Sequence, residues 1–282
     1  MFNLEHKGFF KLTNKELKMD YVCISVPYFL GEKRTGRDET TQIRASGYDR
    51  KIGATWVEVS PQFDAYDDRV VAVNAAITNA IEDNADRFPI IFAADCTSCF
   101  GAVKALGGQE LGVVWFDAHG DFNTPETTPS GFLGGMPLAA LVGRGNQHLL
   151  TGIGLTPLSE SNIIITDARD LDAEEGENLH ASQITIVPTL DDLLTVDLPN
   201  APLYIHLDID ILDPSYMPAL NYPANGGPNP AQVKAALQRV AQDGHVVGLL
   251  VSLWSGDRAQ DEQPLQTTLD LVDAFLASMN AK

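Results

Sequence analysis

The feature that most constrains the fold is a series of short, continuous apolar runs that alternate with longer stretches of helical periodicity. Most of these apolar runs are too short for a helix, and they are continuous, so they are typical of strands buried on both faces. Strands that alternate with helices predict a parallel sheet covered by helices on both sides. The predicted strands are residues 21–26, 90–94, 112–116, 163–166, 184–187, 203–207 and 246–253. The predicted helices are residues 69–87, 97–106, 231–242 and 263–279.

The organisation of the chain favours one domain. No linker rich in proline, glycine and serine, no repeat and no low-complexity tract divides the sequence. Because α/β folds of this length commonly form one unit, residues 1–282 are predicted to be a single domain. Two stretches rich in proline and glycine, residues 125–137 and 214–230, each follow a predicted strand. Open α/β sheets bind ligands in the loops at the carboxyl ends of their strands, so these loops are expected to carry the chemistry.

The charge balance argues against several classes of partner. The chain has 19 Lys and Arg residues against 38 Asp and Glu residues, a formal net charge of −19. Binding to nucleic acid or to an anionic membrane surface requires a basic face, so neither is expected. No apolar run approaches the ~18 residues of a membrane span, and residues 1–20 lack the apolar core of a secretory signal. Three cysteines, an odd count, argue against a disulfide framework, and we expect a cytoplasmic protein.

The densest group of chemically active side chains follows the predicted strand 112–116. Residues 115–123 read WFDAHGDFN, in which Asp117, His119 and Asp121 occupy alternating positions. If the extended conformation continues, all three side chains point the same way. Packing two carboxylates and an imidazole together is costly without a cation. The segment therefore indicates a metal site, and the alternative is a solvated loop with capping aspartates.

A second strand end repeats this pattern. Residues 203–214 read LYIHLDIDILDP, where Asp208 and Asp210 are expected to share a face and Asp213 to begin a turn. Four aspartates on two strand ends would repel one another in a shared cleft unless divalent ions neutralised them. Two ions of charge +2 balance four carboxylates.

A third segment, residues 90–99, reads IIFAADCTSC, a buried strand that leads into a polar turn and a helix. Together the three segments resemble the arginase, or ureohydrolase, family, whose motifs read approximately GGDH, DAHxDxN and SxDxDxxDP. The resemblance spans about residues 21–253 in order. It implies a three-layer α/β/α fold with a mainly parallel sheet of about eight strands, and assembly into a homo-trimer or hexamer. It also implies a hydrolase with two manganese ions per subunit.

The resemblance assigns roles to individual residues. Asp117 and Asp208 correspond to the carboxylates that bridge the two ions. Asp121 corresponds to a ligand of the first ion, and His119 and Asp210 correspond to ligands of the second. The implied catalytic residues are His119 and Asp121, of which Asp121 relays a proton from the attacking water to the leaving amine. The reaction cleaves a C–N bond of a guanidino group, giving urea or hydroxyurea, and metals favour it by lowering the pKa of water.

The amino-acid end of the substrate has its own signals. Asn123 and Ser130 stand where arginases hold the α-carboxylate. Asp172 ends the segment RDLD at 169–172, which is similar to the family motif whose last aspartate contacts the α-amino group. Polar donors for a carboxylate and an acid for an ammonium match a zwitterion. The resemblance thus implies a small guanidino amino acid rather than agmatine, which lacks the carboxylate.

The sequence departs from the family at the reacting end. Cys96 stands where the motif has a metal-binding histidine, and a thiolate suits zinc better than manganese, so we expect loose manganese binding and tolerance of zinc there. Gly134 replaces a histidine that shuttles protons, and a glycine can shuttle none. Ser252, a predicted substrate-binding residue, stands where a glutamate pairs with the guanidinium, and residues 218–223 are bulkier than the family's loop.

These departures favour an altered guanidine over arginine. Without the glutamate the preference for a full cation weakens, and the lost shuttle matters less when the leaving amine is less basic. N-hydroxy-L-arginine fits both changes, and its hydrolysis is the family branch that we associate with a cysteine at this ligand position. The alternatives are an arginase or other guanidino-acid hydrolase, and a catalytically inactive arginase-like binding protein.

Two further features have competing interpretations. Cys96 and Cys99 form C-x-x-C at the start of a predicted helix, the spacing of a thiol redox site, and a helix N-terminus would lower the pKa of the first thiol. Chains with a redox site of this kind do not carry the two carboxylate segments, and Cys99 is equally typical of a helix core. His206, two residues before Asp208, is either a partner that orients a metal ligand or a core histidine.

Overall fold

The structure is a computed structural model that describes residues 19–36 and 38–281. The prediction that residues 1–20 carry no secretory signal therefore falls almost wholly outside the described residues. Among the described helices, none combines the length and the apolar character needed to cross a membrane.

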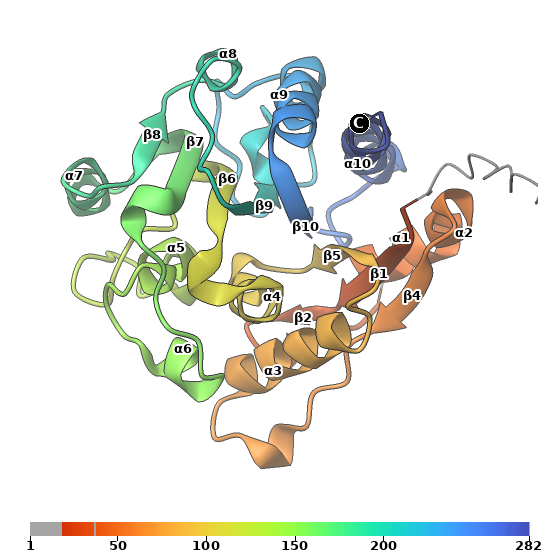
Figure 1. The fold of residues 1–282 in the computed structure, drawn as a ribbon, viewed down its shortest axis with the longest axis horizontal. Helices are drawn as coiled ribbons and strands as arrows, with labels where there is room; N and C mark the ends of the chain where they lie inside the picture. Colours follow the sequence, from red (N-terminus) through yellow and green to blue (C-terminus); the bar gives the residue numbers. More distant parts are fainter. Residues whose placement is uncertain (1–18, 37, 282) are drawn as a thin grey trace, which may run out of the picture.

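One parallel sheet of eight strands runs through the centre of the described chain, in the order β4-β1-β5-β10-β9-β6-β7-β8 (Figure 1). Its strands are β1 (Tyr21–Val26), β4 (Thr55–Glu58), β5 (Phe88–Ala93), β6 (Gly112–His119), β7 (Ile163–Asp170), β8 (Thr185–Val187), β9 (Pro202–Asp208) and β10 (His245–Ser252). A separate antiparallel pair is formed by β2 (Tyr28–Phe29) and β3 (Glu32–Lys33).

The α-helices of the described residues fall into two layers. They are α1 (Glu39–Ser46), α2 (Tyr48–Ile52), α3 (Arg69–Glu82), α4 (Cys99–Leu106), α5 (Pro137–Leu141), α6 (His148–Gly152), α7 (Ala173–His180), α8 (Leu190–Leu193), α9 (Pro230–Asp243) and α10 (Gln263–Met279). Figure 1 shows α3, α4, α5 and α6 on one side of the sheet and α1, α2, α8, α9 and α10 on the other. The expected three-layer α/β/α architecture with a mainly parallel sheet of about eight strands is confirmed.

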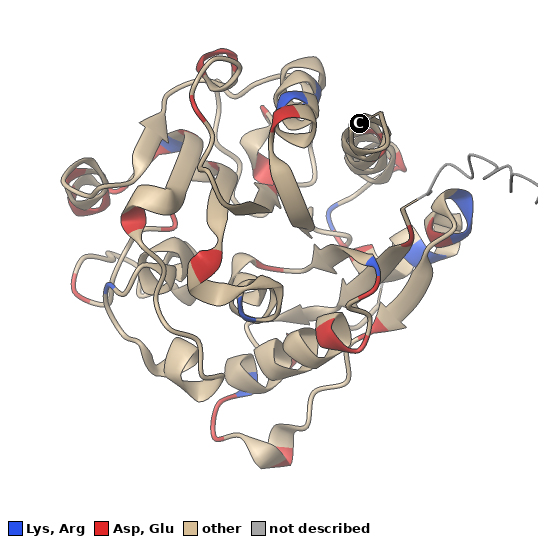
Figure 2. Ribbon diagram, viewed as in Figure 1, with Lys and Arg blue, Asp and Glu red and all other residues tan. Residues whose placement is uncertain are grey.

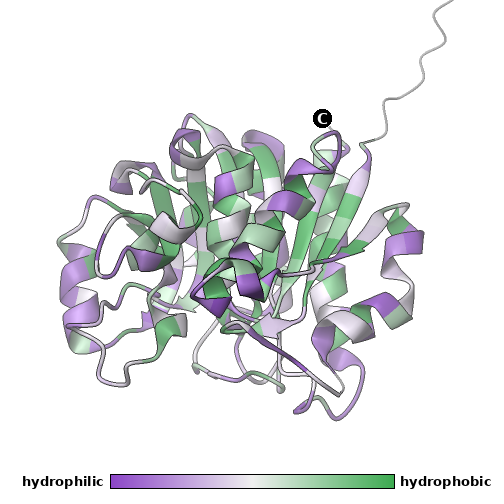
Figure 3. Ribbon diagram, turned by 90° about the horizontal axis from the view of Figure 1, so that it is seen from below, coloured by the Kyte–Doolittle hydropathy of each residue, from purple (hydrophilic) through white to green (hydrophobic). Residues whose placement is uncertain are grey.

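The two layers enclose two apolar cores, one on each face of the sheet. In β1, Tyr21 and Cys23 belong to one core, whereas Val22 and Ile24 belong to the other. This division follows because successive side chains of a strand point to opposite faces. Figure 3 shows the apolar strands inside and hydrophilic positions on the outer surfaces of the helices. Figure 2 shows acidic positions on both sides of the sheet and fewer basic ones, in agreement with the net charge of −19.

The predicted elements differ from the observed ones mainly at their ends. The predicted boundaries of β1 and α10 are confirmed. The helix expected over residues 69–87 ends at Glu82, because a polar turn follows it. The helix expected over residues 97–106 begins as a 3₁₀ turn, η2 (Cys96–Ser98), before α4.

The register of the sheet brings distant parts of the sequence to one edge. In the pairing of β6 with β9, Trp115 lies opposite His206, so the residues that follow at the strand ends are neighbours as well. In the pairing of β10 with β9, Ser252 lies opposite Asp208. Because all these strands are parallel, their carboxyl ends open on the same side of the molecule.

Candidate metal centre

The end of β6 places a buried carboxylate with both oxygens held. Asp117 is 1% exposed, and it accepts hydrogen bonds from the His119 backbone N–H at 2.7 Å and from the Trp115 indole at 3.0 Å. The strand ends at His119, and Asp121 has φ +48°, so the extended conformation that sequence analysis assumed does not continue to Asp121. The chain turns here, because the next residue donates its backbone N–H to Glu175 at 2.9 Å. The turn still directs Asp121 into the same cavity.

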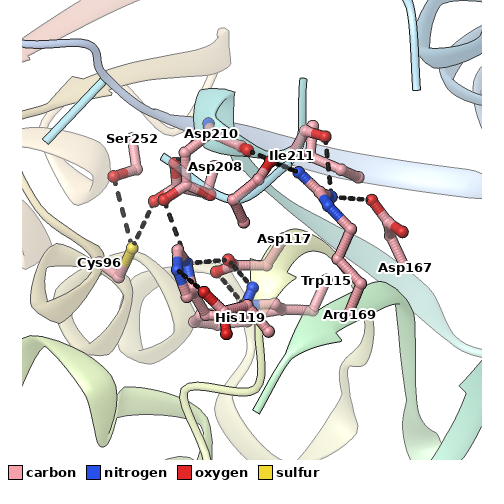
Figure 4. A network of polar contacts seen from close by, with 12 residues as sticks. Cys96, Trp115, Asp117, His119, Asp167, Arg169, Asp208, Asp210, Ile211 and Ser252 are labelled. Atoms are coloured by element: carbon pink, nitrogen blue, oxygen red, sulfur yellow. Dashed lines mark hydrogen bonds and ion pairs between the residues drawn. The ribbon is translucent and has the colours of Figure 1, made fainter. Parts of the chain in front are cut away.

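The end of β9 resembles the end of β6, because here too an aspartate carboxylate accepts the backbone N–H of the residue two positions later. The strand ends at Asp208, whose carboxylate accepts the Asp210 backbone N–H at 2.9 Å and so begins a 3₁₀ turn, η6 (Ile209–Ile211). The expectation of one shared strand face for the two aspartates is wrong, because this turn replaces the strand. Arg169 holds the turn by donating to the Ile211 carbonyl at 3.1 Å and by pairing with Asp167 (Figure 4).

Cys96 enters the site from η2, at the end of β5. Its Sγ atom lies 2.9 Å from Asp208 Oδ2 and 3.4 Å from Ser252 Oγ (Figure 4). Burial, followed by the charges of Asp208 and Asp121, raises the pKa of the Cys96 thiol well above its usual value. The expected lowering of that pKa at a helix N-terminus is therefore wrong, since these carboxylates and the burial outweigh the helix end. Cys96 and Cys99 are both buried and free.

His119 lies between two of the carboxylates. Its Nδ1 atom is 3.4 Å from Asp117 Oδ1 and 3.2 Å from Asp210 Oδ2 (Figure 4). Burial by itself works to lower the pKa of the imidazole, but the hydrogen bonds and charges of Asp117 and Asp210 raise it to about 12. The negative charge around His119 therefore favours the protonated imidazole.

The remaining carboxyl groups show the same excess of negative charge. Burial and the charges of neighbouring aspartates raise the pKa of Asp121 and of Asp208 well above the usual value. Burial, followed by the charge of Asp117, raises the pKa of Asp210 to about 6. Asp121 Oδ2, Asp210 Oδ1 and His206 Nε2 are buried and have no hydrogen-bond partner among the described residues. Crowded carboxylates and unpartnered polar atoms fit a site that cations complete.

Two groups of side chains in the described chain have the spacing of metal ligands. One potential ligand atom from each member lies within 4.8 Å of those of the others. The first group is Cys96, Asp117, His206 and Asp208, and the second is Asp117, His119 and Asp210. Since Asp117 belongs to both, the arrangement has room for two ions that share a carboxylate. Asp121 belongs to neither group, although it lines the same cavity.

Apart from His206, these side chains line one cavity of about 520 Å³. The predicted site residues that line it are Cys96, Asp117, His119, Asp121, Asn123, Ser130, Asp172, Asp208, Asp210 and Ser252. Asn123 Nδ2 donates to Asp172 Oδ2 at 2.9 Å, which joins two of the residues expected at the amino-acid end. Ser130 and Asp172 are exposed at the rim, whereas Asn123 and Ser252 are buried. The structure thus brings the predicted residues together, and their individual roles stay predictions.

Glu175 is a site residue that sequence analysis missed. It is buried and lines the cavity, and its carboxylate accepts the Phe122 backbone N–H at 2.9 Å and the Asp172 backbone N–H at 3.1 Å. Glu175 therefore connects the turn after β6 to the start of α7. Its signal in the sequence is the capping box formed by Asp172 and the glutamate three residues later.

Three aromatic residues line the cavity, and sequence analysis missed Phe29 and Phe132, whereas Tyr222 belongs to the bulkier segment 218–223 noted there. We call Phe29, Phe132 and Tyr222 the aromatic wall. The ring centroids of Phe29 and Phe132 are 6.4 Å apart, and those of Phe132 and Tyr222 are 5.1 Å apart. A Cβ atom at Gly134 would lie 2.3 Å from Cε1 of Phe132, so the phenyl ring occupies the space of the side chain that Gly134 lacks. Phe29 comes from the short strand β2 and the other two from separate loops, and no sequence pattern connects the three.

Comparison with known proteins identifies relatives across most of the chain. The sequence model of the arginase family matches residues 67–253. An arginase of Brevibacillus brevis is 30% identical over 251 residues, which cover 77% of this chain and 84% of that protein. An N(omega)-hydroxy-L-arginine amidinohydrolase of Streptomyces lavendulae is 30% identical over 211 residues, which cover 72% of this chain and 74% of that protein. The crystal structure of a Bacillus cereus arginase superimposes with a TM-score of 0.79 at 23% identity, covering 92% of this chain and 98% of the other.

Proposed function

This chain belongs to the arginase family of hydrolases, which act on guanidino C–N bonds, and from that premise we propose that it hydrolyses a guanidino amino acid with N-hydroxy-L-arginine as the preferred substrate. The observation that carries the proposal is the cluster of four aspartates at two adjacent strand ends, with buried carboxylate oxygens that have no partner among the described residues. The aspartates are Asp117, Asp121, Asp208 and Asp210.

We propose that these side chains hold two manganese ions. Asp117 and Asp208 would contact both ions, Cys96 and Asp121 the first ion, and His119 and Asp210 the second. The groups of closely spaced ligand atoms support this division for Cys96, Asp117, His119 and Asp210, and for Asp208 at the first ion only. Asp121 belongs to neither group and reaches the cavity from the turn after β6. Two divalent ions bound there would lower the pKa of water and hold it beside the substrate.

The protein residues would bind the substrate and move the proton. In the proposed reaction, water adds to the guanidino carbon, the C–N bond to the δ-nitrogen breaks, and that nitrogen receives a proton. The products are ornithine and hydroxyurea, or urea when arginine reacts. Asp121 would take the proton from water and pass it to the leaving nitrogen; this role is supported by its Oδ2 atom, which is buried in the cavity lining and has no partner among the described residues.

The amino-acid end of the substrate would lie at the rim. Asp172 would pair with the α-ammonium, while Asn123 and Ser130 would donate to the α-carboxylate. The hydrogen bond from Asn123 to Asp172 supports this assignment, because it fixes the relative position of the two recognition groups before the substrate arrives.

The reacting end supports a guanidine that is less basic than arginine. Ser252 is engaged with Cys96 and brings no charge to the cavity. Phe132 fills the space beside Gly134 with an apolar ring, which contributes neither a proton carrier nor a counter-charge. A hydroxyl group on the guanidine lowers its basicity, so the substrate needs less counter-charge from the cavity, whereas the leaving δ-nitrogen is the same as in arginine. The relative from Streptomyces lavendulae, which its name describes as acting on hydroxyarginine, supports the same choice.

The test is a product assay with manganese-loaded protein. Arginine, N-hydroxy-L-arginine, agmatine and guanidinobutyrate are supplied in parallel, and ureas are measured. We expect the highest kcat/KM with N-hydroxy-L-arginine and the lowest with agmatine. Arginine turnover far above that of N-hydroxy-L-arginine would make this chain an arginase, the candidate that the Brevibacillus brevis relative favours. No turnover of any substrate by metal-loaded protein would identify a binding protein instead.

Three broader assignments belong to the same proposal. We propose that residues 1–282 form one domain. The sheet supports this, because only β5 lies between β1, the first strand of the sheet along the chain, and β10, the last one. A cytoplasmic location is supported by three cysteines without disulfide bonds. Assembly into a homo-trimer or hexamer rests on the family alone, and light scattering of the purified chain tests it.

A further inference from the structure

His206 lies under the acidic cluster and is held on two sides. It is fully buried on β9, and its ring stacks on the Trp115 indole of β6, with ring centroids 3.5 Å apart and planes 4° apart. Its Nδ1 atom lies 3.1 Å from the hydroxyl oxygen of Tyr204. The ring therefore has one orientation, set by a strand neighbour and by a hydrogen bond.

The other ring nitrogen of His206 has no partner among the described residues. Nε2 is buried, and neither Asp117 nor Asp208 accepts a hydrogen bond from it. A buried imidazole nitrogen without a partner is costly, so the structure leaves room for a group that would satisfy it. A cation is the group that the surroundings favour, because potential ligand atoms of Cys96, Asp117, Asp208 and His206 lie within 4.8 Å of one another.

The contact with Tyr204 favours a lone pair on Nε2. If Nδ1 carries the proton and donates it to the Tyr204 oxygen, Nε2 has an unshared pair that points away from that bond. Metal-binding histidines commonly donate their other ring N–H to an oxygen, which fixes both the tautomer and the ring orientation.

We propose that His206 is a ligand of the metal ion on the Cys96 side of the cluster, and that Tyr204 positions it. The inference rests on the proposed function only in that the cluster holds metal. Cys96 stands where the family motif has a histidine, so His206, on β9, would return a nitrogen donor to this half of the site. Its donors would then be one thiolate, one imidazole and the carboxylates of Asp117, Asp208 and Asp121, and the thiolate and imidazole suit zinc better than manganese. We therefore expect this half of the site to select zinc over manganese.

The first experiment measures zinc binding by calorimetry and metal content after dialysis. His206→Phe keeps a flat ring to stack on Trp115 but removes the proposed ligand atom Nε2, and we expect its zinc affinity to fall by more than about 100-fold. Tyr204→Phe removes only the hydroxyl that orients the ring, and we expect its zinc affinity to fall less, by about 10- to 100-fold. The melting temperature of each metal-free variant reports whether it folds, and His206→Gln replaces His206→Phe if the latter does not.

The second experiment needs no variant. Side-chain ¹⁵N NMR of the wild-type protein follows the histidine ring nitrogens while zinc chloride is added. We expect one buried histidine to change its Nε2 shift in step with zinc binding and to keep its Nδ1 proton. An Nε2 signal of His206 that does not change at zinc saturation would overturn the proposal.

The outcomes separate the two proposals. Zinc affinity of His206→Phe equal to that of wild type, together with loss of zinc by Cys96→Ser, would make His206 a packing residue and leave the proposed hydrolase intact. Failure of wild-type protein to bind zinc or manganese at all would contradict the metal centre itself. Zinc loss in both His206→Phe and Cys96→Ser, with unchanged metal-free melting temperatures, is the result that we expect.

Discussion

The two sides of the cavity are built in different ways. We call the ligand cluster at the strand ends the floor, and it comprises Cys96, Asp117, His119, Asp208 and Asp210. Its carboxylates are buried and held by backbone N–H groups and by the register of neighbouring strands. The aromatic wall comes from the two-residue strand β2 and two loops, and Tyr222 is 47% exposed. Backbone positions in a sheet move little, whereas loop side chains can repack.

This difference indicates which part controls which property. In the proposed function, the floor would determine what reaction is possible, because each of its charges depends on the others and on the ions proposed to bind among them. The wall would determine which guanidine fits, because it contributes shape and apolar surface without charge. Departures from the family accordingly change the wall and one ligand, and they retain all four aspartates. The following changes test this division, in order of decreasing expected effect.

The largest effect is expected on the floor. Asp208→Asn removes a charge that we assign to both ions, and we expect kcat/KM to fall by about a thousandfold, on the order of 4 kcal/mol of lost transition-state stabilisation. Metal content per chain and steady-state kinetics measure it. Asp191→Asn, at an exposed position of α8, is the matched control and should change neither. If Asp208→Asn kept its full metal content and most of its activity, metal binding and catalysis would not depend on the charge of Asp208, and this division would be wrong.

The polar rim should give a smaller and more selective effect. Asp172→Asn removes the charge proposed to bind the α-ammonium, and we expect kcat/KM for N-hydroxy-L-arginine to fall about tenfold or more, the value of one charge-assisted hydrogen bond. Asparagine retains the N-cap of α7, so the melting temperature should hold. Agmatine lacks the amino-acid group and serves as the control substrate. An equal loss with agmatine would place Asp172 outside amino-acid recognition.

Cys96→His gives the floor the residue that the family motif has at this position. In Cys96→His an imidazole takes the place of a softer thiolate, and we expect manganese to bind roughly tenfold more tightly. Equilibrium dialysis against a chelator of known affinity measures this change. Cys99→Ala, three residues further along and buried in α4, is the control. Unchanged manganese affinity in Cys96→His would show that position 96 does not coordinate the metal.

The smallest effect is expected on the aromatic wall. Gly134→Ala adds a Cβ atom that would lie 2.3 Å from Phe132, so the ring must move, and we expect KM for N-hydroxy-L-arginine to rise about threefold with kcat nearly unchanged. Phe132→Ala combined with Gly134→Ala removes the clash, and a double-mutant cycle then gives the coupling between the two positions. A large loss of kcat in Gly134→Ala alone would assign the wall a part in the chemical step.

Much of this architecture is predictable from the sequence because the sheet is parallel and buried. The run at Tyr21–Val26 is continuous and apolar, and both of its boundaries are confirmed. The edge strand β4 (Thr55–Glu58) was missed because its ends are exposed and it carries no apolar run. The short helix α1 (Glu39–Ser46) was missed for a similar reason, since Ile43 is its main apolar contact with the core.

Some features of the site are predictable from the sequence, and others are not. Each acidic segment follows a strand, and parallel strands end on one side, so the meeting of Asp117 with Asp208 is predictable. The turns that end β6 and β9 are not, because they depend on hydrogen bonds to Glu175 and on the Arg169 contacts with the Ile211 carbonyl. The aromatic wall is less predictable still, since Phe29, Phe132 and Tyr222 meet only across loops.

The sequence by itself determined the layered fold and the presence of an acidic pocket, because both follow from local patterns: apolar runs of strand length, and carboxylates placed directly after them. Only the tertiary structure decided which atoms in that pocket have partners. It stacked His206 on Trp115, left Nε2 without a hydrogen bond, and placed Phe132 over Gly134. These contacts join residues far apart in the chain, and their geometry depends on register and loop packing, which no local pattern encodes.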